Sequence, residues 1–172
     1  MAKGVFLFRS DSIYEDRPEE RYHFPSQYLS RASQFVGDWV LYFEPVKAGS
    51  NGYHAAAKVR RIIPDPSAEG MFFALIEPGS YLPFEHNVRF RMDGEVVEQR
   101  ILNDEGKISG RAQSAVRPIL VGDFDRILLS GFQTTTIFYF GPERRPASPR
   151  SCCLRKTERR FLETLQEIAP FC

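Results

Sequence analysis

Apolar and polar positions are most informative between Gly37 and Pro45. The turn signal Gly37-Asp38 precedes six mostly aromatic or β-branched residues, and Pro45 ends the run. This composition and these boundaries predict a strand over residues 39–44. Because side chains alternate along a strand, its faces carry Trp39, Leu41 and Phe43 on one side and Val40, Tyr42 and Glu44 on the other. Both faces are largely apolar, so we expect this strand inside a sheet or barrel, with Tyr42 and Glu44 at its mouth or reaching solvent.

Hydrophobic periodicity predicts further elements on both sides of this strand. Asn51-Gly52 and Asp93-Gly94 are tight hairpin signals. We expect strands at residues 4–9, 54–63, 70–77, 88–92, 96–102, 115–120 and 134–140, and helices at 26–35 and 123–131. Residues 21–24 and 78–84 are expected in connections. The prediction is an α+β, mainly β fold, a small and partly antiparallel β-barrel with flanking helices.

The composition changes after Gly141. Three prolines between residues 142 and 149 mark a basic, Pro-rich linker, followed by a short amphipathic helix over residues 157–168. We therefore divide the chain into a domain at 1–141 and a tail at 142–172. From Glu143 onward seven basic and four acidic residues give a net charge of +3, which leaves −2 for the remainder. The domain is thus no bulk polyanion binder, and any nucleic-acid contact there must be a local patch.

Several classes of protein find no support in the sequence. No apolar run approaches the ~18 residues of a membrane span and no signal-peptide pattern is present, so we expect a cytoplasmic protein with no membrane partner. The three cysteines are late in the chain and lack metal spacing, so neither a cofactor nor a metal is expected. Motifs of serine hydrolases, P-loop enzymes and zinc proteases are missing, and we predict no catalytic residues.

Three segments carry a resemblance to a known family. They are Glu19–Pro25 with Tyr28-Leu29, Gly37–Pro45, and Gly110–Arg117 with the following Phe124–Phe132. Their order and spacing resemble the N-terminal domain of bacterial HNH-type restriction endonucleases, over roughly residues 4–140. The same layout is similar to EVE domains of the PUA-like superfamily, a fold related to SRA domains.

The resemblance implies a PUA-like barrel whose pocket accepts a flipped, often modified, nucleobase. In the restriction enzymes this domain reads the DNA and a C-terminal HNH domain cuts it. An HNH site needs a histidine base and a metal-binding His or Asn. After Phe140 this chain contains no His, Asn or Asp. The sequence therefore departs from the family by lacking the nuclease, either as a stand-alone reader or through truncation or frame change.

Candidate site residues follow from the chemistry of reading a base. Such a pocket needs a stacking ring, a shaped wall and polar groups at the edge of the base. Glu44 can accept a hydrogen bond from an exocyclic amine, and an arginine-containing strip can hold phosphates. The base-pocket candidates are Tyr22, His23, Phe24, Trp39, Tyr42, Glu44 and Ser114, and the phosphate candidates are Arg21, Arg111, Gln113 and Arg117. The alternatives are a hydrophobic staple at residues 22–24 and an exposed strand edge at residues 111–117.

The sequence thus predicts a non-catalytic nucleic-acid reader. Its partner would be DNA, including methylated or hydroxymethylated DNA, and a separate nuclease subunit is a further expected partner. Two alternatives stay open. One is a protein-interaction or regulatory module whose tail helix docks on a partner, and the other is an RNA-binding PUA-like protein.

Overall fold

A long strand, β4 (Gly52–Pro64), joins the two halves of a seven-stranded sheet. The computed structural model describes residues 2–9, 16–45 and 52–132. The sheet has the order β2-β5-β4-β3-β1-β9, and β6 also pairs with β4. The other strands are β1 (Gly4–Leu7), β2 (Arg21–Pro25), β3 (Trp39–Glu44), β5 (Met71–Ile76), β6 (Leu82–Val88) and β9 (Val116–Pro118).

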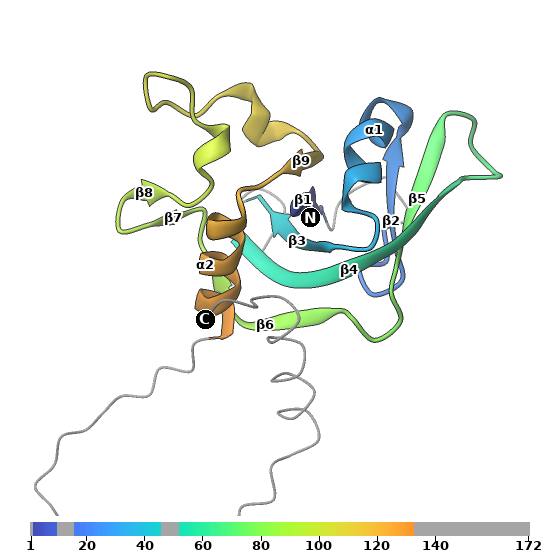
Figure 1. The fold of residues 1–172 in the computed structure, drawn as a ribbon, viewed down its shortest axis with the longest axis horizontal. Coiled ribbons are helices and arrows are strands. Elements are labelled where there is room, and N and C mark those ends of the chain that lie inside the picture. Colours follow the sequence, from blue (N-terminus) through green and yellow to red (C-terminus); the bar gives the residue numbers. More distant parts are fainter. Residues whose placement is uncertain (1, 10–15, 46–51, 133–172) are drawn as a thin grey trace, which may run out of the picture. The chain divides into compact units, whose positions relative to one another are not determined.

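The two halves of β4 have different neighbours, which bends the sheet. Residues 53–58 lie in the half that pairs with β3 and β6, whereas residues 59–64 pair with β5. The strand β1 runs parallel to β3, and the remaining pairs are antiparallel. Figure 1 shows β4 as the long curved strand between α2 and β5. The α+β, mainly β prediction is therefore confirmed.

The predicted closed barrel is not seen in the described part of the chain. No backbone pairing there joins the edge strand β2 to β1 or β9. Side chains span this gap instead, because the Tyr22 hydroxyl donates to the carbonyl oxygens of Leu7 at 2.9 Å and Ala115 at 3.1 Å. The Tyr22 ring also stacks on Phe6 with centroids 4.3 Å apart. The sheet curls toward closure without completing it.

Two helical regions contact β4. The predicted helix at 26–35 consists of three short pieces, η1 (Ser26–Tyr28), α1 (Leu29–Ala32) and η2 (Ser33–Phe35). The predicted helix at 123–131 is confirmed as α2 (Val121–Phe132), which buries Phe124, Ile127 and Leu128 and contacts β6. Between β6 and α2 lie the hairpin β7 (Arg91–Met92) and β8 (Glu95–Val96) and the 3-10 turns η3 (Gln99–Ile101) and η4 (Gly110–Gln113).

The main core lies between the sheet and the helical pieces η1 to η2. Ring side chains dominate it, contributed by Phe6 on β1, Tyr22 and Phe24 on β2, Phe35 on η2 and Tyr42 on β3. Within residues 2–9, 16–45 and 52–132, no helix has the length and apolarity needed to cross a bilayer.

The chain divides into two units, Met1–Gln133 and Thr134–Cys172. The second unit lies outside the described residues, and so do the predicted strand at 134–140 and the predicted helix at 157–168. The boundary at 141/142 therefore stays a prediction.

Candidate functional site

The segment Arg21–Pro25 is a strand and not the expected connection before a helix. Alternation along β2 consequently separates side chains that the sequence analysis had grouped together. Tyr22 and Phe24 point into the core and are almost fully buried. Their rings form walls of the core, and the Tyr22 hydroxyl is bound to two carbonyl oxygens.

Arg21 and His23 project from the opposite side of β2. The Arg21 guanidinium lies 4.6 Å from the centroid of the Phe73 ring, and the His23 ring stacks on the same ring at 4.5 Å. The Nε2 atom of His23 is 3.1 Å from the Asp65 carboxylate. These contacts place His23 on the other side of β2 from Tyr22, whose ring lies 6.3 Å from the Tyr42 ring, centroid to centroid.

Alternation on β3 likewise separates Trp39 from Tyr42. Both residues are buried, but odd-numbered positions of this strand face away from even-numbered ones. Trp39 therefore does not share a face of the sheet with Tyr42.

The hydroxyl of Tyr42 is a buried polar group that lacks a hydrogen bond in the described core. The side chain has no exposed surface, and its oxygen has no hydrogen-bond partner within residues 2–9, 16–45 and 52–132. The rings of His54 and Tyr81 each lie 6.0 Å from the Tyr42 ring, centroid to centroid. Burial, and after it the nearby Tyr22, Asp16 and Tyr81, raise the pKa of Tyr42, so this hydroxyl stays protonated. We call Tyr42, His54, Tyr81 and Asp16 the Tyr42 cluster.

A register shift brings His54 into this cluster. Tyr42 pairs with Ala55 and Phe43 pairs with Tyr53, so His54 is an extra residue on β4. Such a bulge turns a side chain that would otherwise follow regular alternation. The His54 ring lies 5.6 Å from the Phe8 ring. Burial lowers the pKa of His54, against opposing effects from the Glu44 carboxylate and the Gly52 carbonyl, so the ring is neutral at pH 7.

Two carboxylates accompany these rings. Asp16 accepts a hydrogen bond from the backbone N–H of His23 at 2.7 Å. Burial raises the pKa of Asp16 to about 6, although this bond and the charge of His23 act in the opposite direction. Glu44, which was expected at a mouth or in solvent, is 7% exposed. Tyr42 and Glu44 are both close to His54, the first by a ring contact at 6.0 Å between centroids and the second by the effect of its charge on the pKa of His54.

Arg117 is a buried structural residue in this fold. Its Nη2 and Nε atoms donate to the Glu98 carboxylate at 2.6 and 2.9 Å, and Tyr53 donates to the same carboxylate. Its Nη1 donates to the carbonyl oxygens of Ala112 and Ser114, both at 3.3 Å. Burial by itself lowers the pKa of Arg117, but the bonds and charge of Glu98 outweigh it and raise the pKa. The guanidinium stays charged and is not presented to a phosphate.

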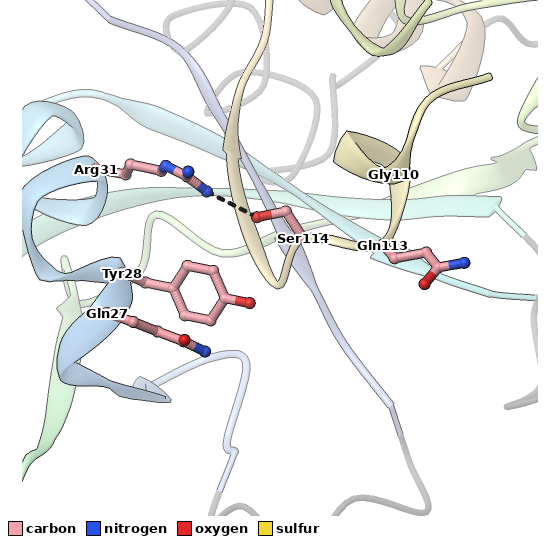
Figure 2. Close-up of a pocket in the computed structure, with 6 residues that line it drawn as sticks. All are labelled: Gln27, Tyr28, Arg31, Gly110, Gln113 and Ser114. Atoms are coloured by element: carbon pink, nitrogen blue, oxygen red, sulfur yellow. Dashed lines mark hydrogen bonds between the residues drawn. The ribbon is translucent and has the colours of Figure 1, made fainter. Parts of the chain in front are cut away.

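A polar cleft of about 470 Å³ lies between the helical pieces and η4. It is lined by Gln27, Tyr28, Arg31, Gly110, Gln113 and Ser114. Figure 2 shows Tyr28 and Arg31 directed from the helical side toward Ser114, whereas Gln113 points away from them. The Nη1 of Arg31 donates to the Ser114 hydroxyl at 3.0 Å, and this hydroxyl donates to the Val116 carbonyl at 2.9 Å.

Some of the predicted phosphate and pocket residues near residue 114 lie at the surface, and Arg117 is buried. Gln113 and Ser114 line the cleft, but Arg111 does not, and its Nη1 lies 3.4 Å from the Arg100 carbonyl oxygen. Several residues of the Tyr42 cluster and the cleft were not predicted from the sequence, namely Asp16, Gln27, Tyr28, Arg31, His54 and Tyr81. A bulge and a long-range juxtaposition place these residues, and neither leaves a pattern in the sequence. In the described part of the chain, no three His, Cys, Asp or Glu side chains gather to hold a metal.

Comparisons with known proteins bear on the fold alone. No protein-family model matches the chain, and no curated protein matches it. Among solved structures, the chain is similar to the NMR structure of Rpa0253 from Rhodopseudomonas palustris, a structural genomics target. The TM-score is 0.51 at 14% sequence identity, over 76% of this chain and 93% of that chain. At this identity the similarity shows a shared fold and nothing more.

Proposed function

We propose that this protein is a nucleic-acid reader of PUA-like fold that binds an extruded, modified base at the Tyr42 cluster. The observation that carries the proposal is the buried Tyr42 hydroxyl without a partner in the described structure. An unpaired hydroxyl in an apolar interior costs about 1–3 kcal/mol. A ligand that presents a polar edge between these rings would remove that cost.

The composition of the cluster favours a base that carries an exocyclic amine. Aromatic side chains stack on bases, and Tyr81 is half-buried, so its ring can present a face to a ligand. At pH 7 the Asp16 carboxyl, with its pKa of about 6, is mostly ionised and can accept from an amine. Cytosine, adenine, guanine and their modified forms have such an amine, whereas thymine and uracil do not.

The PUA-like assignment is part of the same proposal. It rests on the resemblance of three sequence segments to EVE domains and to the reading domain of HNH-type endonucleases. An open, curled, mixed sheet whose edge strands meet through Tyr22 is compatible with a barrel-derived fold. We also propose that the chain has no catalysis of its own and that cutting, where it occurs, belongs to a separate nuclease subunit. Cytoplasmic location is part of this proposal too.

The substitution Tyr42→Phe tests the reader proposal, because it removes one oxygen atom. Binding would be measured on oligonucleotides that are unmodified or carry 5-methylcytosine, 5-hydroxymethylcytosine or N6-methyladenine, and on RNA. We expect the wild-type protein to prefer one modified DNA. In Tyr42→Phe this preference should fall by about 1 kcal/mol, or about fivefold, since one hydrogen bond to the base is lost. The free energy of unfolding should not fall, because no hydrogen bond among the described residues is lost.

Tyr22→Phe is the matched control. It removes a hydroxyl from the neighbouring ring that donates to Leu7 and Ala115, so it should lower the free energy of unfolding by about 1 kcal/mol and leave base preference unchanged. If Tyr42→Phe behaves like this control, the proposal that the base binds at the Tyr42 cluster is wrong. If the wild-type protein binds no oligonucleotide, the reader proposal itself is wrong. Preference for RNA would favour the RNA-binding alternative.

A further inference from the structure

We propose that the cleft between η1–α1 and η4 binds the phosphodiester group next to the base held by the Tyr42 cluster, with Arg31 as its cationic ligand. This inference rests on the proposed function and deepens it. It states that the ligand is a polynucleotide whose chain runs over the cleft, and not a free nucleobase or nucleoside.

The chemistry of the cleft suits one phosphodiester. Arg31 is the cation among the lining residues, and no acid is among them. Arginine binds phosphate oxygens through paired N–H groups in a fixed plane. The bond from Nη1 to Ser114 holds the exposed guanidinium in the cleft while occupying a single N–H. Tyr28 and Gln27 line the same cleft, and their hydroxyl and amide groups are further donors (Figure 2).

Covalent and hydrogen-bonded neighbours connect the cleft to the Tyr42 cluster. Ser114 lines the cleft, and the carbonyl of the next residue, Ala115, accepts from the Tyr22 hydroxyl. The Tyr22 ring then meets the Tyr42 ring edge-on, with centroids 6.3 Å apart. The Tyr22 side chain therefore contacts both the segment that lines the cleft and the Tyr42 ring. We place the base at one site and the adjoining phosphate of the same chain at the other.

The wall of the cleft on the η4 side is fixed from within. Arg117 donates to the carbonyl oxygens of Ala112 and Ser114, and Glu98 holds Arg117 in the core. Ser109 caps the same turn by accepting from the backbone N–H of Arg111 at 3.3 Å. A ligand group that meets such a preformed wall loses less free energy in ordering the protein.

The experiment compares Arg31→Ala with the wild-type protein on two probes across a salt series. One probe is the best oligonucleotide from the modified-base panel, and the other is the matching free nucleoside. We expect Arg31→Ala to weaken oligonucleotide binding about tenfold or more, as for a charged hydrogen bond. The slope of log K against log salt should fall by about 0.7 for single strands or 0.9 for duplexes. Nucleoside binding should not change. Arg31→Lys should retain the salt slope, because it keeps the charge.

Arg91→Ala is the matched control for a lost surface charge. Arg91 is exposed on the β7–β8 hairpin, which lies apart from α1 (Figure 1), and its variant should retain the wild-type slope. An unchanged slope in Arg31→Ala, or an equal loss on oligonucleotide and nucleoside, would overturn the cleft proposal and leave the reader proposal standing. Failure of the wild-type protein to bind any oligonucleotide would overturn both.

Discussion

The burial of an arginine side chain determines whether it can contact a phosphate in this protein. Arg117 and Arg31 are both arginines near residue 114, yet the first is 2% exposed and the second lies at the surface. Phosphate binding was predicted for Arg117, because an arginine-containing strip can hold phosphates. Its partner Glu98 is 19 residues away in the sequence, and no local pattern connects the two. Arg31, the surface cation of the cleft, belongs to the predicted helix at 26–35 and was not among the predicted site residues.

The substitution Arg117→Ala tests this structural role. It leaves the Glu98 carboxylate buried without its cation, and it frees the carbonyl groups of Ala112 and Ser114. We expect the free energy of unfolding to fall by about 3–5 kcal/mol in chemical denaturation, as for other broken buried ion pairs. The salt slope of nucleic-acid binding should not change in protein that remains folded.

Arg111→Ala is the comparison for Arg117→Ala. Arg111 is exposed on the same segment, and its loss should alter the free energy of unfolding by no more than about 0.5 kcal/mol. A stable Arg117→Ala variant with a reduced salt slope would instead support the phosphate role predicted from the sequence.

Elements with strong local signals were predictable from the sequence. Residues 39–44 form β3 as expected, and β4, β5 and α2 lie within a few residues of their predicted bounds. The Asp93-Gly94 turn also occurs, with positive φ at both residues as a two-residue hairpin requires. These segments combine β-branched or amphipathic runs with Gly or Pro at their ends.

Elements that depend on tertiary pairing were not predictable in the same way. Arg21–Pro25 becomes a strand because β5 pairs with it, although a proline ends it and a helix was expected next. The segment Leu82–Val88 becomes β6 through pairing with β4, despite Pro83 and several polar residues. Residues 110–113 form a 3-10 turn, so that only Val116 and Arg117 of the segment 111–117, considered as an exposed strand edge, are strand. Arg111 and Gln113 therefore lie on a turn and not on a strand beside Arg117.

At Gly131, α2 packs closely against Phe84 of β6. Gly131 is close to the Phe84 ring, so that an added Cβ would lie 2.5 Å from ring atoms. In an open helix Gly→Ala stabilises by about 1 kcal/mol, but here the clash should dominate. We expect Gly131→Ala to lower the free energy of unfolding by about 1–3 kcal/mol, measured by chemical denaturation.

Gly122→Ala provides a control in the same helix. No atom lies within 4 Å of the Cβ that it would add, so this variant should be neutral or slightly stabilising. Equal effects of the two substitutions would show that the contact between α2 and Phe84 is looser than the structure indicates.

At the scale of the whole molecule, the fold puts both proposed contacts where the curled sheet nearly closes. Tyr22 joins β2 to the carbonyl oxygens of Leu7 and Ala115 there, with Tyr42 on one side and the cleft on the other. Sequence periodicity predicts the strands that make such a sheet, but it does not predict where its edges meet. The class of fold was therefore accessible from the sequence, and the composition of the site was only partly so.

Residues 143–172 are expected to be dispensable for folding. The aromatic core is contributed by residues 6–76 and 116, and α2 ends at Phe132. The sequence places a Pro-rich linker after Gly141, and such linkers separate units that fold independently. We therefore expect deletion of residues 143–172 to leave the thermal unfolding transition nearly unchanged, as followed by circular dichroism. A loss of several degrees, or an insoluble product, would show that Phe161, Leu165 and Ile168 belong to the core. The full-length protein measured in parallel is the reference, and retained nucleic-acid binding by the truncated chain would further place the reading function within residues 1–142.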